Sequence, residues 1–291
     1  MLRLAAGYLS VELAPAAGGC VSAARLRLGD REFHLLRPLV GPPNALRSGM
    51  FPMVPFANCI RDNRFAFDGR SWTVQPNMAG VRLNFHGSGW RSAWRVASAD
   101  EGSAKLVLDD GRVDDVYRYD AIQRFSLAPD AIAVETELAN CGDVRMPFTF
   151  GQHPWFPVHT GAFVRFAATS LWLCDADGHA ESRGPIPPTA DYATPRAPPS
   201  RYCNVCYAGW DGRVDITWPN EGAAISMVAD PVFGHLMLHV PGDGEPVFCL
   251  EPQTAPPCAF DGLGSGSAAG IHILEPGERI SGRICFVIRD P

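Results

Sequence analysis

Short runs in which apolar and polar residues alternate recur along the whole chain. In the clearest run, positions 132, 134, 136 and 138 carry Ile, Val, Thr and Leu, whereas Glu135 and Glu137 lie between them. Successive side chains of a strand point to opposite faces, so this run predicts a strand with one buried and one partly wet face. Elsewhere, Gly29-Asp30 and Asp68-Gly69 separate pairs of runs and predict hairpin turns.

Similar runs predict strands over most of the chain: Val21–Leu28, Arg31–Leu36, Arg64–Phe67, Ser71–Val74, Phe163–Ala167, Leu171–Cys174, Val214–Trp218, Ala223–Val228, Leu236–Val240, Val247–Leu250 and Ile284–Ile288. The sequence shows neither a helical stripe over three turns nor a glycine-rich phosphate loop of the Walker or dinucleotide type. More than ten short strands joined by turns predict an all-β fold, a large antiparallel sandwich.

Glycine and proline content supports this fold class. The 291 residues include 29 Gly and 26 Pro, which disfavour a helix bundle because both residues interrupt helices. Six prolines lie between Gly184 and Pro199, in a segment that is either a linker between two domains or a long ordered loop. Strands of the same character flank it, so we favour the loop and a single domain over residues 1–291.

Charge and cysteine content limit the partners and the compartment. The net charge is −6, with a single lysine, Lys105, and no basic tract, which argues against a nucleic acid partner. Glu12 interrupts the first apolar stretch, and no run is long enough for a signal peptide or a membrane span. The nine scattered cysteines resemble reduced thiols, so we expect a cytoplasmic protein. Cys203 and Cys206 lack a second ligand pair, so we predict no metal.

Three segments place polar side chains among apolar ones. His86 lies at the expected end of a strand, before a glycine-rich bend, and His153 precedes Pro154, which favours an extended backbone. Trp155 and the other aromatic residues beside His153 are expected to form a pocket wall. Glu251 ends an apolar strand, where burial would raise the pKa of its carboxyl toward the range of a general base. Taken singly, each of these residues also has an ordinary structural explanation.

Taken together, the motifs resemble the aldose 1-epimerase (galactose mutarotase) family. The resemblance covers nearly the whole chain, in the family's order and at similar spacings. It rests on Asn58-Cys59-Ile60, Phe67-Asp68-Gly69, Phe85-His86-Gly87, His153-Pro154-Trp155-Phe156, Pro188-Thr189, Gly209-Trp210 and Leu250-Glu251-Pro252-Gln253. It implies a single antiparallel β supersandwich and the interconversion of the α and β anomers of a free sugar, without a metal or an organic cofactor.

The resemblance also implies roles for individual residues. Glu251 would be the base at the anomeric hydroxyl and His153 the acid at the ring oxygen, while His86 would bind the sugar near that oxygen. Opening a pyranose removes a proton from the anomeric hydroxyl and delivers one to the ring oxygen. We therefore expect the acid and the base on opposite sides of one cleft, spaced for a sugar ring. Trp155 and Asn58 are further candidate sugar-binding residues.

Two positions depart from the family pattern. Cys59 stands where the family usually has an arginine, and Arg61, expected on the same strand face, is the candidate substitute. Asn204 aligns with the family's sugar-binding aspartate and provides hydrogen bonds without charge. Both changes spare the expected acid and base, so they bear on which sugar binds more than on epimerisation.

Two other functions remain open at this stage. A hexose-6-phosphate 1-epimerase would need converging arginines, for which Arg61, Arg64, Arg91 and Arg95 are candidates. A non-catalytic carbohydrate-binding or sugar-sensing protein would bind a sugar without exchanging its anomers. The expected partner is in each case a small sugar, and the sequence predicts no oligomeric state.

Overall fold

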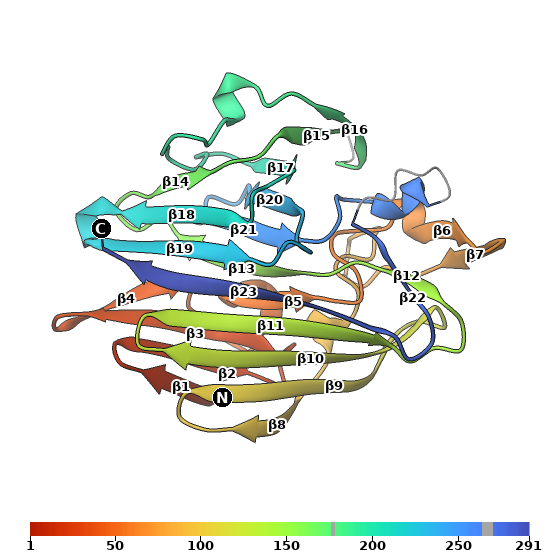
Figure 1. Cartoon of the computed structure of the whole chain (residues 1–291), viewed down its shortest axis with the longest axis horizontal. Helices are drawn as coiled ribbons and strands as arrows, with labels where there is room; N and C mark the ends of the chain where they lie inside the picture. Colours follow the sequence, from red (N-terminus) through yellow and green to blue (C-terminus); the bar gives the residue numbers. More distant parts are fainter. Residues whose placement is uncertain (176–177, 264–269, 291) are drawn as a thin grey trace.

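The computed structural model describes residues 1–175, 178–263 and 270–290, and strands dominate it. Most strands belong to two antiparallel sheets that lie face to face, and Figure 1 looks onto the smaller one. The helical segments in these residues are 3-10 turns: η1 (Ala45–Arg47), η2 (Arg61–Asn63), η3 (Gly89–Arg91), η4 (Pro188–Ala190), η5 (Pro219–Glu221) and η6 (Ala259–Gly262). The predicted all-β class and large antiparallel sandwich are confirmed.

The larger sheet has eleven strands in the described residues, in the order β1-β2-β3-β5-β13-β21-β20-β17-β15-β16, with β4 paired to β3. Its strands are β1 (Leu2–Ala6), β2 (Leu9–Ala14), β3 (Cys20–Leu28), β4 (Arg31–Leu36), β5 (Met50–Met53), β13 (Gly151–Pro157), β15 (Ser170–Cys174), β16 (Ala180–Gly184), β17 (Cys203–Ala208), β20 (His235–Val240) and β21 (Val247–Gln253).

The smaller sheet has eight strands in the order β14-β18-β19-β23-β11-β10-β9-β8 (Figure 1). They are β8 (Arg95–Ala99), β9 (Ser103–Val113), β10 (Tyr117–Ala128), β11 (Ala131–Asn140), β14 (Phe163–Phe166), β18 (Arg213–Trp218), β19 (Ala223–Ala229) and β23 (Arg279–Arg289). Two separate two-stranded sheets complete the described strands: β6 (Arg64–Phe67) with β7 (Arg70–Thr73), and β12 (Met146–Phe148) with β22 (His272–Leu274).

Strand β11 shows why alternation predicted this architecture. Ile132, Val134 and Leu138 are buried, whereas Glu135 and Glu137 are half-buried on the other face. Both carboxylates pair there with the same guanidinium, that of the β10 residue facing Glu135. One face of the strand therefore contributes to the core while the other stays polar.

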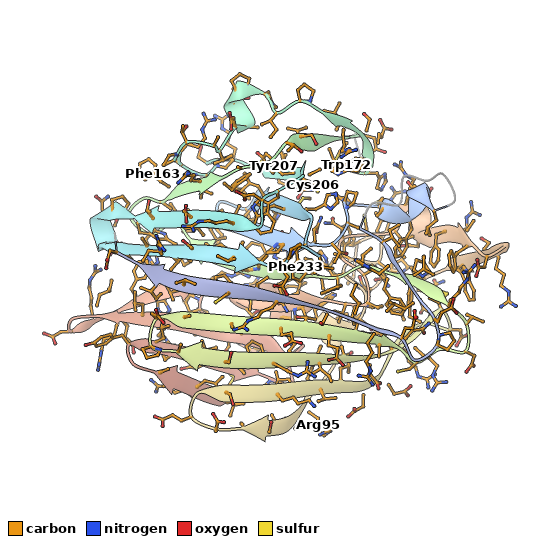
Figure 2. The ribbon with its side chains drawn as sticks, in the orientation of Figure 1. Arg95, Phe163, Trp172, Cys206, Tyr207 and Phe233 are labelled. Atoms are coloured by element: carbon orange, nitrogen blue, oxygen red, sulfur yellow. The ribbon has the colours of Figure 1, made fainter. Side chains whose placement is uncertain are left out.

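The core lies between the two sheets and is rich in aromatic side chains. Phe156 of β13 stacks on Phe248 of β21 at a ring distance of 5.6 Å and meets Phe286 of β23, in the smaller sheet, at 6.2 Å. Phe233, labelled in Figure 2, packs on Phe150 at 5.2 Å. These contacts pack the larger sheet tightly against the smaller one.

The proline-rich segment between Gly184 and Pro199 packs along strand β14. Arg196 forms an isolated bridge with Val164, and the buried ring of Tyr192 stacks on Phe166 at 5.1 Å. The chain then enters β17, which pairs with β15 and β20 of the larger sheet. The strands before and after the segment thus share one sheet. None of the described helices has the length and apolar character needed to cross a membrane.

Candidate active site

A cleft of about 560 Å³ brings together residues that are far apart in the chain. Asn58, His86, His153, Asn204 and Glu251 of the predicted site all line it. The other described lining residues are Leu46, Cys59, Met78, Val81, Phe85, Cys174, Asp175, Gly178, Tyr202, Met237 and His239. A second hollow, of about 640 Å³, lies beside the proline-rich segment and is lined mainly by apolar and proline residues. The first cleft therefore carries the candidate chemistry.

Strands β13 and β21 place a histidine opposite a glutamate. Gly151 faces Gln253 and Trp155 faces Cys249 in the antiparallel register, so His153 lies across from Glu251. Pro154 and Pro252, which each follow one of these two residues, have no N–H to donate to a regular ladder. Neither Pro154 nor Pro252 can therefore donate a backbone hydrogen bond to a neighbouring strand.

The two side chains are in direct contact. His153 Nε2 lies 3.2 Å from Glu251 Oε1, and the residues are 7% and 2% exposed. Burial raises the pKa of the Glu251 carboxyl well above 4.5. Burial also lowers the pKa of the His153 imidazole well below 6.5, and His86, His239 and Arg37 act in the same direction. Between these two pKa values the pair holds one proton, which the contact lets either partner carry.

This contact corrects one expectation. The acid and the base do not flank the cleft from opposite sides; they lie next to one another in its wall. The chemistry explains why the expectation was wrong. The anomeric oxygen and the ring oxygen of a pyranose are bonded to the same carbon, so they are closer together than two hydrogen-bonded atoms. Two adjacent groups can therefore serve both oxygens.

The ring of His153 is held between two aromatic side chains. Phe51 stacks on it at a centroid distance of 4.6 Å and Trp155 at 5.0 Å. The guanidinium of Arg37 covers the Trp155 ring at 4.0 Å. Trp155 is not among the described residues that line the cleft, so it does not form the predicted pocket wall. It lies two residues from His153 on the same strand face and supports the imidazole instead.

His86 lies in a tight loop rather than at the end of a strand. Its φ is 58°, and isolated bridges flank it on both sides, from Phe85 to Cys59 and from Gly87 to Val54. His86 Nδ1 accepts a hydrogen bond from the backbone N–H of Asn58 at 3.0 Å. The backbone N–H of His86 in turn donates to the backbone carbonyl of Asn58 at 2.7 Å. Because Nδ1 is an acceptor, the ring proton resides on Nε2. Burial lowers the pKa of His86 to about 3, so the ring is a neutral donor.

The remaining polar wall comes from adjacent strands. Asn204 of β17 faces His239 of β20, and His239 Nδ1 lies 3.0 Å from Asn204 Oδ1. On the other side, Asn58 donates from Nδ2 to Oε1 of the fully buried Gln253 at 3.1 Å. His239, which belongs to none of the sequence motifs, also lines the cleft. Only strand pairing brings it there, so no local pattern could have identified it.

Arg61 is not placed as predicted. The chain leaves the extended conformation at η2, so Arg61 does not share a strand face with Cys59. The Arg61 guanidinium instead pairs with the carboxylates of Asp175 and Asp261 and is 30% exposed. Its two anionic partners raise its pKa further. Arg61 therefore reaches the cleft only through Asp175, which lines it.

Two clusters of described residues have the donor atoms for a metal ion. One is His153, Cys249 and Glu251, and the other is Cys59, His179 and Cys258. The sequence pair Cys203 and Cys206 is not such a cluster. These cysteines are three residues apart on β17, so their side chains point to opposite faces of the sheet, and Cys206 (Figure 2) is fully buried.

Comparisons with known proteins agree with this architecture. The sequence profile of aldose 1-epimerases matches residues 6–286. The uncharacterized protein YphB of Escherichia coli K12 is 32% identical over 257 residues, 84% of this chain and 85% of that protein. A crystal structure from Escherichia coli K12, provisionally named as an aldose 1-epimerase, has a TM-score of 0.91 and 29% identity and covers 99% of this chain and 98% of its own. A galactose mutarotase-like protein from Clostridium acetobutylicum shares the fold, with a TM-score of 0.83 at 17% identity over 99% of this chain and 95% of its own.

Proposed function

The chain belongs to the aldose 1-epimerase family, and we propose that it interconverts the α and β anomers of a free sugar by opening and reclosing the ring. The observation that carries the proposal is the contact of 3.2 Å between His153 Nε2 and Glu251 Oε1 in the wall of the cleft. A pair that shares one proton can take a proton from one oxygen of the sugar while it gives a proton to the other.

The proton balance of the reaction fits this pair. Transfer of the shared proton to His153 makes Glu251 a carboxylate base and His153 an imidazolium acid. Glu251 then takes the proton of the anomeric hydroxyl and His153 protonates the ring oxygen as the bond from that oxygen to the anomeric carbon breaks. The open aldehyde rotates by half a turn, and the reverse transfers close the ring on its other face. The pair ends with the one proton it began with.

The surrounding residues would bind and orient the sugar. The neutral His86 ring offers Nε2–H as a donor to the ring oxygen, where negative charge develops as the bond to the anomeric carbon breaks. Asn204, His239 and Asp175 offer acceptors and donors for sugar hydroxyls from the opposite strands and loop. Asn58 fixes the His86 loop through the two hydrogen bonds described above.

The cleft favours an uncharged sugar over a sugar phosphate. No arginine or lysine is among the described residues that line it, whereas Asp175 adds negative charge. Of the arginines considered for phosphate, Arg61 is held by two carboxylates and Arg95 pairs with Asp109 at 60% side-chain exposure. A phosphate group at this site would lack the converging guanidinium groups that usually bind it.

The test is anomer exchange measured by NMR on a panel of free sugars, with glucose 6-phosphate beside glucose. We expect Glu251→Gln and His153→Asn to slow exchange by about 10²–10⁴-fold each, because each removes one proton-transfer group. His235→Asn is the matched control: His235 is also a buried histidine, but its Nδ1 bonds the Thr254 carbonyl and it does not line the cleft. This control should exchange anomers at the rate of the wild type.

Thermal melting of each variant separates lost chemistry from lost folding. If both variants are folded yet match the wild type, or if no sugar exchanges faster than in buffer, the proposal is wrong. Calorimetric binding of a sugar without exchange would instead identify a binding or sensing protein. Faster exchange of glucose 6-phosphate than of glucose would identify the phosphate-specific function.

A further inference from the structure

Three buried donor groups meet beside the cleft, outside the His153–Glu251 pair. Cys59 Sγ and Cys258 Sγ are 3.1 Å apart, and donor atoms of Cys59, Cys258 and His179 all lie within 4.8 Å of one another. The three residues are 7%, 2% and 5% exposed. They come from three separate segments: Cys59 follows β5, His179 precedes β16 and Cys258 precedes η6. Only the folded chain brings them together.

The orientation of His179 points to a ligand. Its Nδ1 lies 3.0 Å from Asp175 Oδ2, so Nδ1–H donates to the carboxylate and Nε2 keeps its lone pair. Nε2 is buried and has no hydrogen-bond partner among the described residues. A buried polar atom of this kind is costly unless something binds it. A carboxylate behind a histidine whose other nitrogen is left as an acceptor is the usual arrangement around a metal-binding imidazole.

From this geometry we propose that Cys59, Cys258 and His179 Nε2 bind one Zn²⁺ ion. Two thiolates and one imidazole are a donor set that zinc prefers, and three protein ligands leave the fourth tetrahedral position for water or a substrate oxygen. Cys59 lines the cleft, so that position lies beside the proposed sugar site. Zn–S bonds of about 2.3 Å separate two sulfurs by about 3.8 Å in a tetrahedron, so the two cysteines move apart by about 0.7 Å when zinc binds.

A disulfide between Cys59 and Cys258 is the competing explanation of the short sulfur distance. It would require the sulfurs to approach to about 2.05 Å, a larger movement than zinc requires. It would also leave His179 Nε2 buried and unpaired, whereas zinc satisfies all three groups. The histidine therefore favours the ion over the disulfide.

The test measures zinc on the full chain, without sugar, so that its result does not depend on the proposed epimerase activity. The protein is purified with a phosphine reductant, stripped with a chelator, and titrated with Zn²⁺ against a chromophoric competitor and with Co²⁺ as a spectroscopic probe. We expect one ion per chain and, with Co²⁺, the intense visible bands and sulfur charge-transfer bands of a tetrahedral thiolate site.

Variants identify the ligands. Cys258→Ser and His179→Gln should weaken Zn²⁺ binding by more than about 100-fold and abolish the tetrahedral cobalt spectrum. Asp175→Asn should weaken Zn²⁺ binding by about 10–100-fold and keep the tetrahedral cobalt spectrum, because Asp175 orients the imidazole rather than binding the ion. Cys203→Ser, which changes a half-buried cysteine outside the cluster, should leave both unchanged.

Each contrary result overturns the proposal. A stripped and reduced wild type, folded by circular dichroism, that shows no tetrahedral cobalt spectrum has no such site. Zinc binding that His179→Gln does not weaken excludes the imidazole. Non-reducing peptide mapping of protein purified without reductant that finds Cys59 linked to Cys258 assigns the pair to a disulfide.

Discussion

At the scale of single residues, burial acts in opposite directions on the two partners of the His153–Glu251 pair. It disfavours the charged form of each, and therefore raises the pKa of the carboxyl and lowers that of the imidazole. Phe51 and Trp155 hold the imidazole plane from both sides. The same apolar surroundings that orient the ring thus keep the pair singly protonated.

This protonation state predicts a broad pH plateau for anomer exchange. As pH falls, the pair gains a second proton only through the lowered pKa of His153, below 6.5. As pH rises, the pair loses its proton only through the raised pKa of Glu251, above 4.5. We therefore expect kcat/KM to decrease on the acid side only well below pH 6.5 and on the alkaline side only well above pH 4.5. A pH profile with a limb at the unperturbed pKa of histidine or of glutamate would contradict the shared proton.

The cation at Arg37 contributes to the lowered pKa of His153. In Arg37→Met we expect the acid limb of the pH profile to move toward higher pH, because a protonated imidazole no longer faces a nearby positive charge. The pH profile is the decisive readout, since a purely structural effect of losing the hydrogen bonds from Arg37 to the Ser48 carbonyl would lower the rate at every pH. Arg95→Met, on the outer strand β8 (Figure 2), is the control and should leave the limb unmoved.

The sequence predicted individual residues where a local motif carried them. His153 before Pro154 and Glu251 at the end of an apolar strand stand out in the primary structure. His179 and Cys258 do not, because their significance depends on a neighbour that is remote in the chain, such as Cys59, which lies 199 residues from Cys258. Arg61 was misplaced for a related reason: strand geometry was extended past the point where the chain turns into η2.

At the scale of elements, the His86 loop depends on a close backbone approach at Gly87. Gly87 has φ 61°, and a Cβ added there would lie 2.4 Å from Pro55 Cδ and 2.6 Å from the Val54 carbonyl oxygen. The glycine allows the loop to pack against the end of β5 and to hold His86 beside Asn58. The Asp68-Gly69 turn predicted the hairpin of β6 and β7, but local patterns carry no information on this irregular loop, whose shape is set by contacts with distant residues.

Gly87→Ala should therefore destabilise the protein by more than about 1 kcal/mol in urea unfolding and raise the KM for sugar. The matched control is Gly80→Ala. Gly80 also has a positive φ, of 75°, but nothing lies within 4 Å of the added Cβ, so this variant carries only the backbone strain. The difference between the two variants measures the close approach. Equal unfolding midpoints would mean that the loop accommodates a side chain and that Gly87 does not position His86.

At the scale of the whole molecule, the sandwich makes a rigid support for site residues from segments that are far apart in the chain. Strands β13, β20, β21 and β17 are neighbours in the larger sheet, although β13 and β17 are well separated in sequence. Alternation and turn residues were sufficient to predict the fold class, because half-buried strands show a period of two. They could not predict strand order, and so they could not predict that His239 of β20 lies beside Asn204 of β17.

The burial of neutral histidines should contribute stability to this molecule that is lost in acid. Burial lowers the pKa of His86 to about 3 and that of His153 well below 6.5, so each takes up a proton on unfolding once the pH falls below 6.5. The stability that these neutral histidines contribute is fully present above pH 6.5. It decreases as the pH falls toward their folded-state pKa values, by about 1.4 kcal/mol per pH unit for each such proton. In His86→Gln we expect the slope of unfolding free energy between pH 6 and pH 4 to be shallower by about one proton. Unfolding in urea at a series of pH values measures both proteins, and an unchanged slope in His86→Gln would mean that His86 is protonated in the folded protein and does not act as a neutral donor.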